Sequence, residues 1–270
     1  MQGAGAIAKY TFAYLCTEPL FLTRSGVYAV TSQDVTGEKY SQNRSFYVNG
    51  KLLSESNLSE AFAYVYHDMY WLCLNGAIYI LDGLQPVQTD KSLPYATRQY
   101  ACFYRTNVAA RVMWSVDDVL YFGDSTGNIY QFYTDSSSQE SYNDNGTAIT
   151  CKWETPDIDG KLFYKNKTFR YLAVRLKSAV ATSIKFYVQK RGLWNEVKED
   201  TTSARYLAFN QVDFEKFTFS TDATQKVIPC KIRVKKVDKA RFRIVNDALN
   251  EPFGLFDLAF EYVESGNYKG

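Results

Sequence analysis

Histidine is almost absent from this chain of 270 residues, and that scarcity excludes most chemistry that depends on an imidazole base. The single histidine, His67, lies in the stretch Tyr-His-Asp-Met, whose composition is typical of a hairpin tip. A serine or cysteine nucleophile that relies on histidine would need His67 as its base. We therefore expect no histidine-dependent hydrolase, whereas a carboxylate pair for glycoside cleavage, distant in sequence, is left open.

Cysteine is also sparse, and its five copies are scattered rather than paired: Cys16, Cys73, Cys102, Cys151 and Cys230. Disulfide scaffolds and zinc sites use short, paired cysteine spacings, and this sequence lacks them. We expect the cysteines to be reduced, mostly buried small apolar residues of a protein made in a cytosol.

The sequence has no apolar run long enough to span a membrane, and residues 1–9 lack the charged and then apolar order of a secretion signal. Phosphate-cradling loops, dinucleotide-binding glycine patterns and Cys/His clusters are missing as well. Asp157 and Asp159 resemble the start of a calcium loop, but the later ligands are absent, so a turn between domains is the better interpretation. We expect a soluble protein without catalytic residues, cofactor or bound metal.

What the sequence does contain is a repeat. Tyr28, Tyr79 and Tyr130 each end a similar stretch (RSGVY, NGAIY and STGNIY), and successive tyrosines are 51 residues apart (79 − 28 and 130 − 79). A repeat of this length is typical of propeller and solenoid architectures. Aromatic residues make up 16% of the chain, which favours strands over helices.

Each repeat has the pattern strand, turn, strand, glycine turn, strand, followed by a polar return to a fourth strand. First strands are expected at residues 10–15, 61–66 and 111–116, second strands at 20–22, 69–74 and 119–122, and fourth strands at 44–48, 99–104 and 148–154. Residues 17–19, 67–68 and 117–118 suit the first turns, and Ser25-Gly26 and Asn75-Gly76 suit turns that need positive φ. The pattern predicts a partial β-propeller of about three four-stranded blades, at about 10–60, 61–110 and 111–154.

The chain changes character near residue 150. Residues 1–147 carry 9 Lys and Arg against 14 Asp and Glu, whereas residues 148–270 carry 22 against 15, which gives net charges of −5 and +7. Residues 135–146 are polar and loop-like, and the tyrosine repeat stops after them. Further strands are expected at 169–176, 183–190, 205–210, 217–220, 231–235, 240–245 and 255–263. We therefore predict an all-β protein with propeller-like repeats at 1–147 and a β-sandwich domain at 148–270.

A cluster of basic residues in the second domain is the candidate interface: Lys231, Arg233, Lys235, Lys236, Lys239, Arg241 and Arg243. Strand alternation predicts Ile232 and Val234 on a packed face and the cations on the opposite face. A solvated strand face, a contact with another protein or domain, and nucleic-acid binding all remain open. Nucleic acid is the least favoured, because Phe242 alternates with arginines and is expected in the core, not among the charges.

Three stretches carry a resemblance to a known family: residues 32–48 (SQDVTGEKYSQNRSFYV), 152–170 (KWETPDIDGKLFYKNKTFR) and 241–262 (RFRIVNDALNEPFGLFDLAFEY). They resemble β-propeller proteins of tailed bacteriophages and prophages that are described as stabilisation or tail proteins, and the resemblance covers almost the whole chain. It implies a non-enzymatic structural component of the virion, in the tail or at the head-to-tail junction, made in the cytoplasm of the bacterial host. Other tail or neck proteins would be its partners, and neither nucleic acid nor a membrane is expected.

The chain departs from that family in length, since the family's proteins have further blades before the part that this chain resembles. Closed propellers have 4 to 8 blades, so three repeats cannot close a ring. Three explanations stay open: the chain is the C-terminal part of a larger protein, another polypeptide completes its ring, or it assembles as a homo-oligomer. The alternative function is a host-receptor or glycan-binding module of a phage tail.

Overall fold

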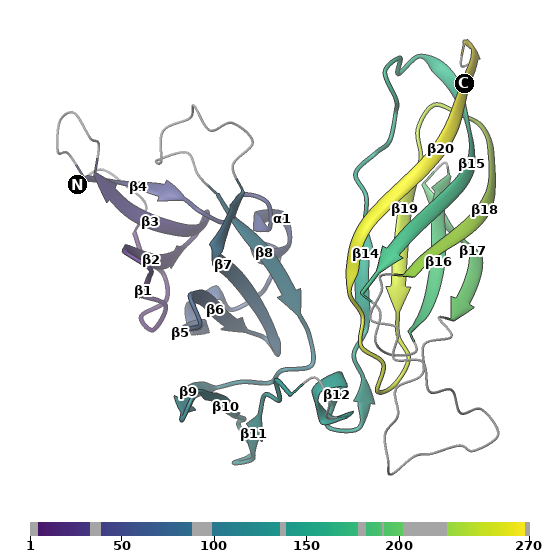
Figure 1. The fold of residues 1–270 in the computed structure, drawn as a ribbon. Coiled ribbons are helices and arrows are strands. Elements are labelled where there is room, and N and C mark those ends of the chain that lie inside the picture. Colours follow the sequence, from purple (N-terminus) through teal and green to yellow (C-terminus); the bar gives the residue numbers. More distant parts are fainter. Residues whose placement is uncertain are drawn as a thin grey trace, which may run out of the picture. The chain divides into compact units, whose positions relative to one another are not determined.

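The computed structural model describes residues 5–32, 39–87, 99–135, 139–177, 182–190, 192–201 and 226–267. The protein is all-β and consists of antiparallel sheets, with the four-residue helix α1 (Asn49–Leu52) and short 3₁₀ turns among them (Figure 1). It divides into two compact units, Met1–Tyr133 and Thr134–Gly270, whereas the change in sequence character was predicted at residues 147 and 148. The described residues contain no closed propeller.

The first sheet is an antiparallel meander in the order β1-β2-β3-β4. Its strands are β1 (Ala13–Leu15), β2 (Glu18–Thr23), β3 (Gly26–Ser32) and β4 (Lys39–Asn43). The fourth strand was predicted at 44–48, which is wrong. After β4 the chain turns toward α1, where the Ser45 amide donates to the Asn43 side chain at 2.9 Å, and Arg44 points inward.

The second sheet repeats this meander in the order β5-β6-β7-β8. Its strands are β5 (Phe62–Tyr66), β6 (Met69–Leu74), β7 (Ala77–Val87) and β8 (Gln99–Arg105). The strands predicted at 61–66, 69–74 and 99–104 are confirmed to within a residue at each end.

The third sheet has three strands, in the order β11-β10-β9. They are β9 (Val112–Val116), β10 (Val119–Gly123) and β11 (Ile129–Gln131). The fourth strand predicted at 148–154 is wrong for this sheet. Those residues form β13 (Thr147–Ala148), which pairs with β12 (Asn143–Asp144), and β14 (Cys151–Glu154), which joins a sheet of the second unit.

Several hairpin turns have the positive φ that two-residue loops require. His67 and Asp68 (48° and 54°) and Asp117 and Asp118 (49° and 62°) form such tips, as the sequence predicted. Asn75-Gly76 does so too, with φ of 51° and 73°.

The turns of the first sheet lie one or two residues earlier than predicted. Thr23 pairs with Gly26, so Arg24 and Ser25 form the loop and Gly26 opens β3. A Cβ on Gly26 would lie 2.4 Å from Asn49 Oδ1, which is why glycine is required there. Similarly, Leu15 pairs with Glu18, so the first turn is formed by residues 16–17 and not by 17–19.

The three sheets of the first unit pack in chain order through two separate cores. Between the first two sheets lie Leu15, Leu20, Leu22, Val27 and Ala29 of one and Tyr70, Leu72, Leu74, Tyr79 and Leu81 of the other. Between the second and third lie Cys73, Ile78 and Ile80 of one and Met113, Leu120 and Phe122 of the other. The second sheet thus gives alternate residues of each strand to opposite cores, and both of its faces are apolar.

A buried ion pair between β2 and the residue that follows β4 lies beside the core that the first two sheets share. Arg44 donates from Nε to Glu18 Oε2 at 3.0 Å and from Nη2 to Oε1 at 2.7 Å, and Arg44 is only 1% exposed. The hydroxyl of Tyr100, on β8, donates to the same carboxylate at 2.8 Å. The bidentate contact with Arg44 and the hydrogen bond from Tyr100 replace the hydrogen bonds to water that the buried carboxylate loses.

The core of the second unit lies between two sheets. One has the order β14-β19-β16-β17, with β16 (Ser183–Lys190), β17 (Leu193–Thr201) and β19 (Arg241–Asn246). The other has the order β18-β15-β20, with β15 (Lys165–Leu176), β18 (Lys226–Val237) and β20 (Leu255–Asn267). Both contribute to the core, for example Phe186 and Phe242 from the first and Phe169 and Ile232 from the second. The strands predicted at 205–210 and 217–220 lie outside the described residues, and β17 was not predicted.

Removing one partner of the Glu18–Arg44 pair should destabilise the first unit strongly. We expect Arg44→Met to lower the free energy of unfolding by about 3–5 kcal/mol, because it leaves a buried carboxylate without its counter-charge. Urea unfolding of both variants measures this, with Arg24→Met, at an exposed turn, as the control expected within about 0.5 kcal/mol of wild type. Equal stability of the two variants would show that the pair is energetically neutral.

Candidate functional site

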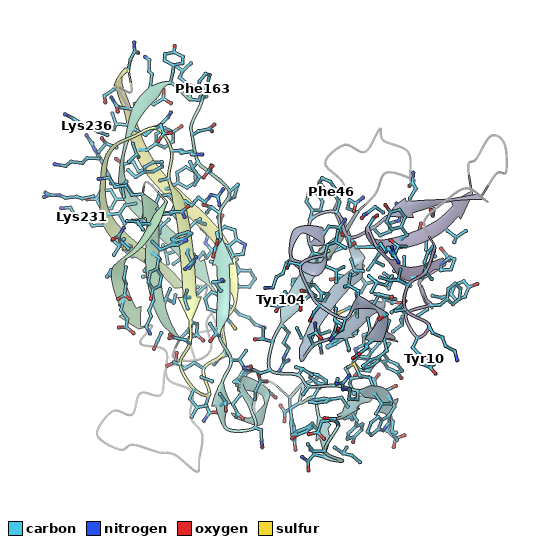
Figure 2. The ribbon with its side chains drawn as sticks, turned by 180° about the vertical axis from the view of Figure 1, so that it is seen from behind. Tyr10, Phe46, Tyr104, Phe163, Lys231 and Lys236 are labelled. Atoms are coloured by element: carbon cyan, nitrogen blue, oxygen red, sulfur yellow. The ribbon has the colours of Figure 1, made fainter. Side chains whose placement is uncertain are left out.

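Four of the seven predicted cations lie together at one edge of the second unit. Lys231, Arg233, Lys235 and Lys236 are exposed on β18, while Ile232 and Val234 between them are buried, as the alternation predicted. Figure 2 shows Lys231 and Lys236 projecting from this edge. Lys236 adopts φ of 53° where the pairing of β18 with β15 is irregular, and this explains why two successive lysines are both exposed. We call these four residues the β18 basic strip.

The β18 basic strip has no carboxylate partner within the part of the chain that the structure describes. β18 is also the last strand of its sheet in hydrogen-bonding order. Lysines on an edge strand hinder unwanted strand pairing, so the strip has a structural explanation as well as a binding one.

The other three cations pair with carboxylates of the second unit. Lys239 Nζ lies 2.7 Å and Arg241 Nε 2.6 Å from the carboxylate of Asp157. Arg243 Nε lies 2.8 Å from Glu154 Oε1, and its guanidinium stands 3.9 Å from the centre of the Trp194 ring. Arg241 and Arg243 belong to β19, in a different sheet from β18. The seven residues therefore do not form one charged face.

Of two sequence expectations around these cations, the burial of Phe242 is confirmed, whereas the turn at Asp157 and Asp159 was predicted between the two domains and lies within the second unit, between β14 and β15. Phe242 is fully buried and packs on Phe169, with ring centroids 5.3 Å apart, so it does not interleave with the charges as an exposed base-stacking platform would. Asp157 lies in a connecting segment next to a bridge between Ile158 and Ala240, and its carboxylate serves two cations. The hydrogen bonds from Arg241 and Lys239 hold the pKa of Asp157 below its usual value.

His67 lies at the tip between β5 and β6, as predicted. Its ring stacks on Tyr66 with centroids 4.0 Å apart, and Nε2 lies 2.6 Å from Asp118 Oδ1 at the corresponding tip of the third sheet. Both side chains are more than half exposed, so this pair is a contact between two hairpin tips.

A serine motif lies in the turn between β10 and β11. Residues 123–127, Gly-Asp-Ser-Thr-Gly, have the spacing of a nucleophile elbow, but an elbow joins a strand to a helix and here the turn joins two antiparallel strands. Asp124 organises the turn by accepting hydrogen bonds from the Thr126 hydroxyl and from the amides of Thr126 and Asn128, and these lower the pKa of Asp124 to about 2. Among the described residues none hydrogen-bonds to the Ser125 hydroxyl.

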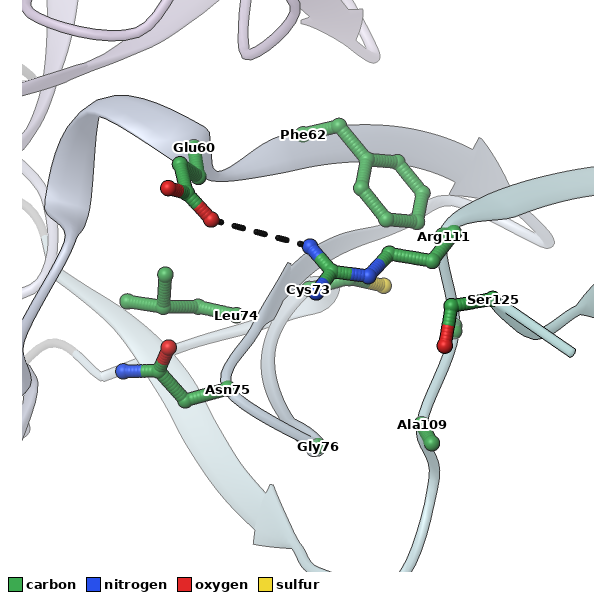
Figure 3. Close-up of a pocket in the computed structure, with 10 residues that line it drawn as sticks. Glu60, Phe62, Cys73, Leu74, Asn75, Gly76, Ala109, Arg111 and Ser125 are labelled. Carbon is green, nitrogen blue, oxygen red and sulfur yellow. Dashed lines mark ion pairs between the residues drawn. The ribbon is translucent and has the colours of Figure 1, made fainter.

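Ser125 also lines a small cavity of about 140 Å³ between the second and third sheets (Figure 3). Arg111 and Glu60 face each other across it at 3.7 Å, with Cys73 and Phe62 beside them. Both charged side chains are about 60% exposed, so the pair is solvated and worth little energetically.

The cysteines are all free, and Cys73 and Cys230 are buried as expected, whereas Cys16 is exposed. Burial raises the pKa of Cys102 to about 12, which keeps that thiol protonated and unreactive. Among the residues that the structure describes, no three His, Cys, Asp or Glu side chains gather as metal ligands would. Nor does any helix in the described ranges have the length and apolar character to cross a membrane.

Neither the family models nor the curated proteins include a match to this chain.

The pKa of Asp157 provides a test of the pairing that neutralises Lys239 and Arg241. We expect its carboxyl to titrate below the usual value of about 3.9 and Arg241→Gln to raise that midpoint. Lys231→Gln, in the β18 basic strip, should leave it unchanged. Because the folded pKa is depressed, the pairing stabilises the fold above the usual aspartate pKa, and this contribution is lost as pH falls through the lowered value. Carboxyl NMR titration of the three proteins measures the midpoints.

Proposed function

We propose that this chain is a non-enzymatic structural component of a phage or prophage virion that acts through protein contacts in the tail or at the head-to-tail junction. In this proposal the three meanders of residues 1–133 are blades of a partial β-propeller and the second unit is a β-sandwich. The resemblance of residues 32–48, 152–170 and 241–262 to tail and stabilisation proteins supports the assignment. Its partners are other virion proteins, and it is made in the host cytoplasm.

The observation that carries the proposal is the contrast between the paired and the unpaired cations of the second unit. Lys239, Arg241 and Arg243 are satisfied by Asp157 and Glu154, whereas the four residues of the β18 basic strip are exposed without a described carboxylate partner. An acidic protein surface would complement such a strip and would orient the chain as it docks.

Incorporation into particles tests this function. In a lysogen that carries the gene, we expect mass spectrometry to detect the chain in purified tailed particles. Charge reversal of the β18 basic strip to glutamate should lower its amount per particle at least about tenfold, the loss expected when the main charged contacts of an interface become repulsive.

The matched control reverses four exposed cations elsewhere, Arg24, Lys51, Lys161 and Lys190, and gives the same change in net charge. This control should be incorporated normally. Absence of the wild-type chain from the particles would contradict the virion assignment, and equal loss in both variants would contradict the role of the strip.

A groove in the first unit favours a second candidate, a host-receptor or glycan-binding module. The groove encloses about 450 Å³ and is lined by Glu55, Asn75, Tyr104, Thr106 and Asn107, a mixture of polar and aromatic side chains that suits a sugar. The Tyr104 ring, however, already contacts Tyr79 at 4.9 Å between centroids and carries Lys51 Nζ 4.3 Å from its centre. The ring therefore offers little free face for stacking, and protein contact is the better supported function.

A glycan array distinguishes the two candidates. If the groove binds sugar, Tyr104→Ala should reduce the signal at least about tenfold, since aromatic anchors dominate such sites, while Tyr133→Ala, exposed outside the groove, should not. For a structural protein we expect no specific signal from the wild-type chain at all. Reproducible binding that is lost only in Tyr104→Ala would favour the receptor-binding function.

A further inference from the structure

The three sheets of the first unit stack in the same manner, as their strand pairing shows. Leu22 pairs with Val27 in the first sheet, and the equivalent pair in the second sheet, Cys73 with Ile78, lies 51 residues later (73 − 22 and 78 − 27). The first of these pairs faces the second sheet, and the equivalent pair faces the third sheet. Every sheet thus has a leading face, which packs on the next sheet in the chain, and a trailing face, which packs on the preceding one.

The leading face of the third sheet has no sheet against it in the described part of the chain. Gly123 pairs with Ile129, so Ile129 is the equivalent of Ile78. Tyr121 pairs with Trp114, and the corresponding pair in the second sheet is Trp71 with Tyr64. The face is apolar. Val112, Val116 and Ile129 are 51%, 53% and 67% exposed, and the half-buried rings of Trp114 and Tyr121 stack with centroids 5.9 Å apart.

The trailing face of the first sheet is open over β1 and the residues just before it, whereas Phe21, on β2, is only 8% exposed. Phe21 and Tyr28 pair with each other and are equivalent to Leu72 and Tyr79 of the second sheet. Leu72 and Tyr79 pack on the first sheet. On the neighbouring β1 and just before it, Tyr14 and Phe12 are 60% and 58% exposed and form an edge-to-face pair. Apolar surface of this extent is normally covered in the assembled protein.

We propose that these two open faces bind each other between two copies of this chain, leading face of the third sheet to trailing face of the first. Each open face has the register and the apolar character of a face that another sheet of this chain already covers. A second copy of the chain can supply the sheet that each open face lacks. Such a contact is heterologous, so it must close into a ring or extend as a filament. Two copies of the three described sheets make six, within the range of 4 to 8 that closed propellers adopt, whereas three copies make nine, so we expect this chain of 270 residues to form a dimeric ring.

The repeat also places individual residues at this contact. Tyr64 Oη lies 2.8 Å from Ser115 Oγ between the second and third sheets. Trp114 and Tyr64 lie at the same position on the first strand of their sheets, because each pairs with the same position of the second strand. Tyr14 and Ser115 are equivalent for the same reason. Trp114 of one copy should therefore meet Tyr14 of the other, and these aromatic residues are the anchors of the interface.

Complementation between two blocked variants tests the proposal, and it uses the purified chain without any virion, so its outcome is independent of the proposed function. Sedimentation velocity should give the wild type twice the mass of 30.9 kDa. Val116→Lys blocks the leading face and Tyr14→Lys the trailing face, and each alone should raise the dissociation constant at least about tenfold. An equimolar mixture of the two should recover the dimer, because one unmutated leading face still meets one unmutated trailing face.

The controls separate this contact from loss of folding and from other modes of association. Leu84→Lys changes an equally exposed apolar residue of the second sheet and should leave the dimer intact. Thermal unfolding verifies that each variant folds, and Ile129→Lys and Phe12→Lys replace any variant that does not. A monomeric wild type, an oligomer other than a dimer, or a mixture that stays monomeric would each overturn the proposal.

Discussion

Both faces of each sheet in the first unit are apolar, and the organisation of that unit depends on this constraint. A sheet with one polar face can lie on a single core, whereas the second sheet here needs a neighbour on each side and has them. The buried Glu18–Arg44 pair and the Tyr100 hydroxyl fix the first of these junctions at a defined register. The same constraint leaves the first and third sheets each with one face to cover, and it links the fold of the unit to its assembly.

The second unit differs, since two of its sheets enclose one core. The cations of this unit fall into two groups. Those near β14 are held by Asp157 and Glu154 and contribute to the fold, whereas those on β18 extend into solvent without such partners. Only the second group lacks a described carboxylate partner, and the proposed docking on an acidic surface rests on it.

The serine motif and the single histidine both lie at turns of the first unit. The serine of residues 123–127 lies in a hairpin turn shaped by Asp124, and His67 contacts a neighbouring hairpin tip. The apolar faces at the two ends of the stack of sheets and the β18 basic strip are the surfaces on which the proposed contacts rest.

The sequence by itself determined the all-β class, the register of the tyrosine repeat and the alternation on β18, because strand periodicity and positive-φ turns are local properties that a few residues encode. Tertiary structure alone decided which cations remain available. Arg241 and Arg243 resemble Arg233 in sequence, but their carboxylates lie more than 80 residues away and reach them only through the pairing of β14 with β19 and the segment that follows β14. It also decided that residues 151–154 join the second unit and leave the third sheet with three strands. Pairing between distant strands depends on the partners available in space, and no local pattern records that choice.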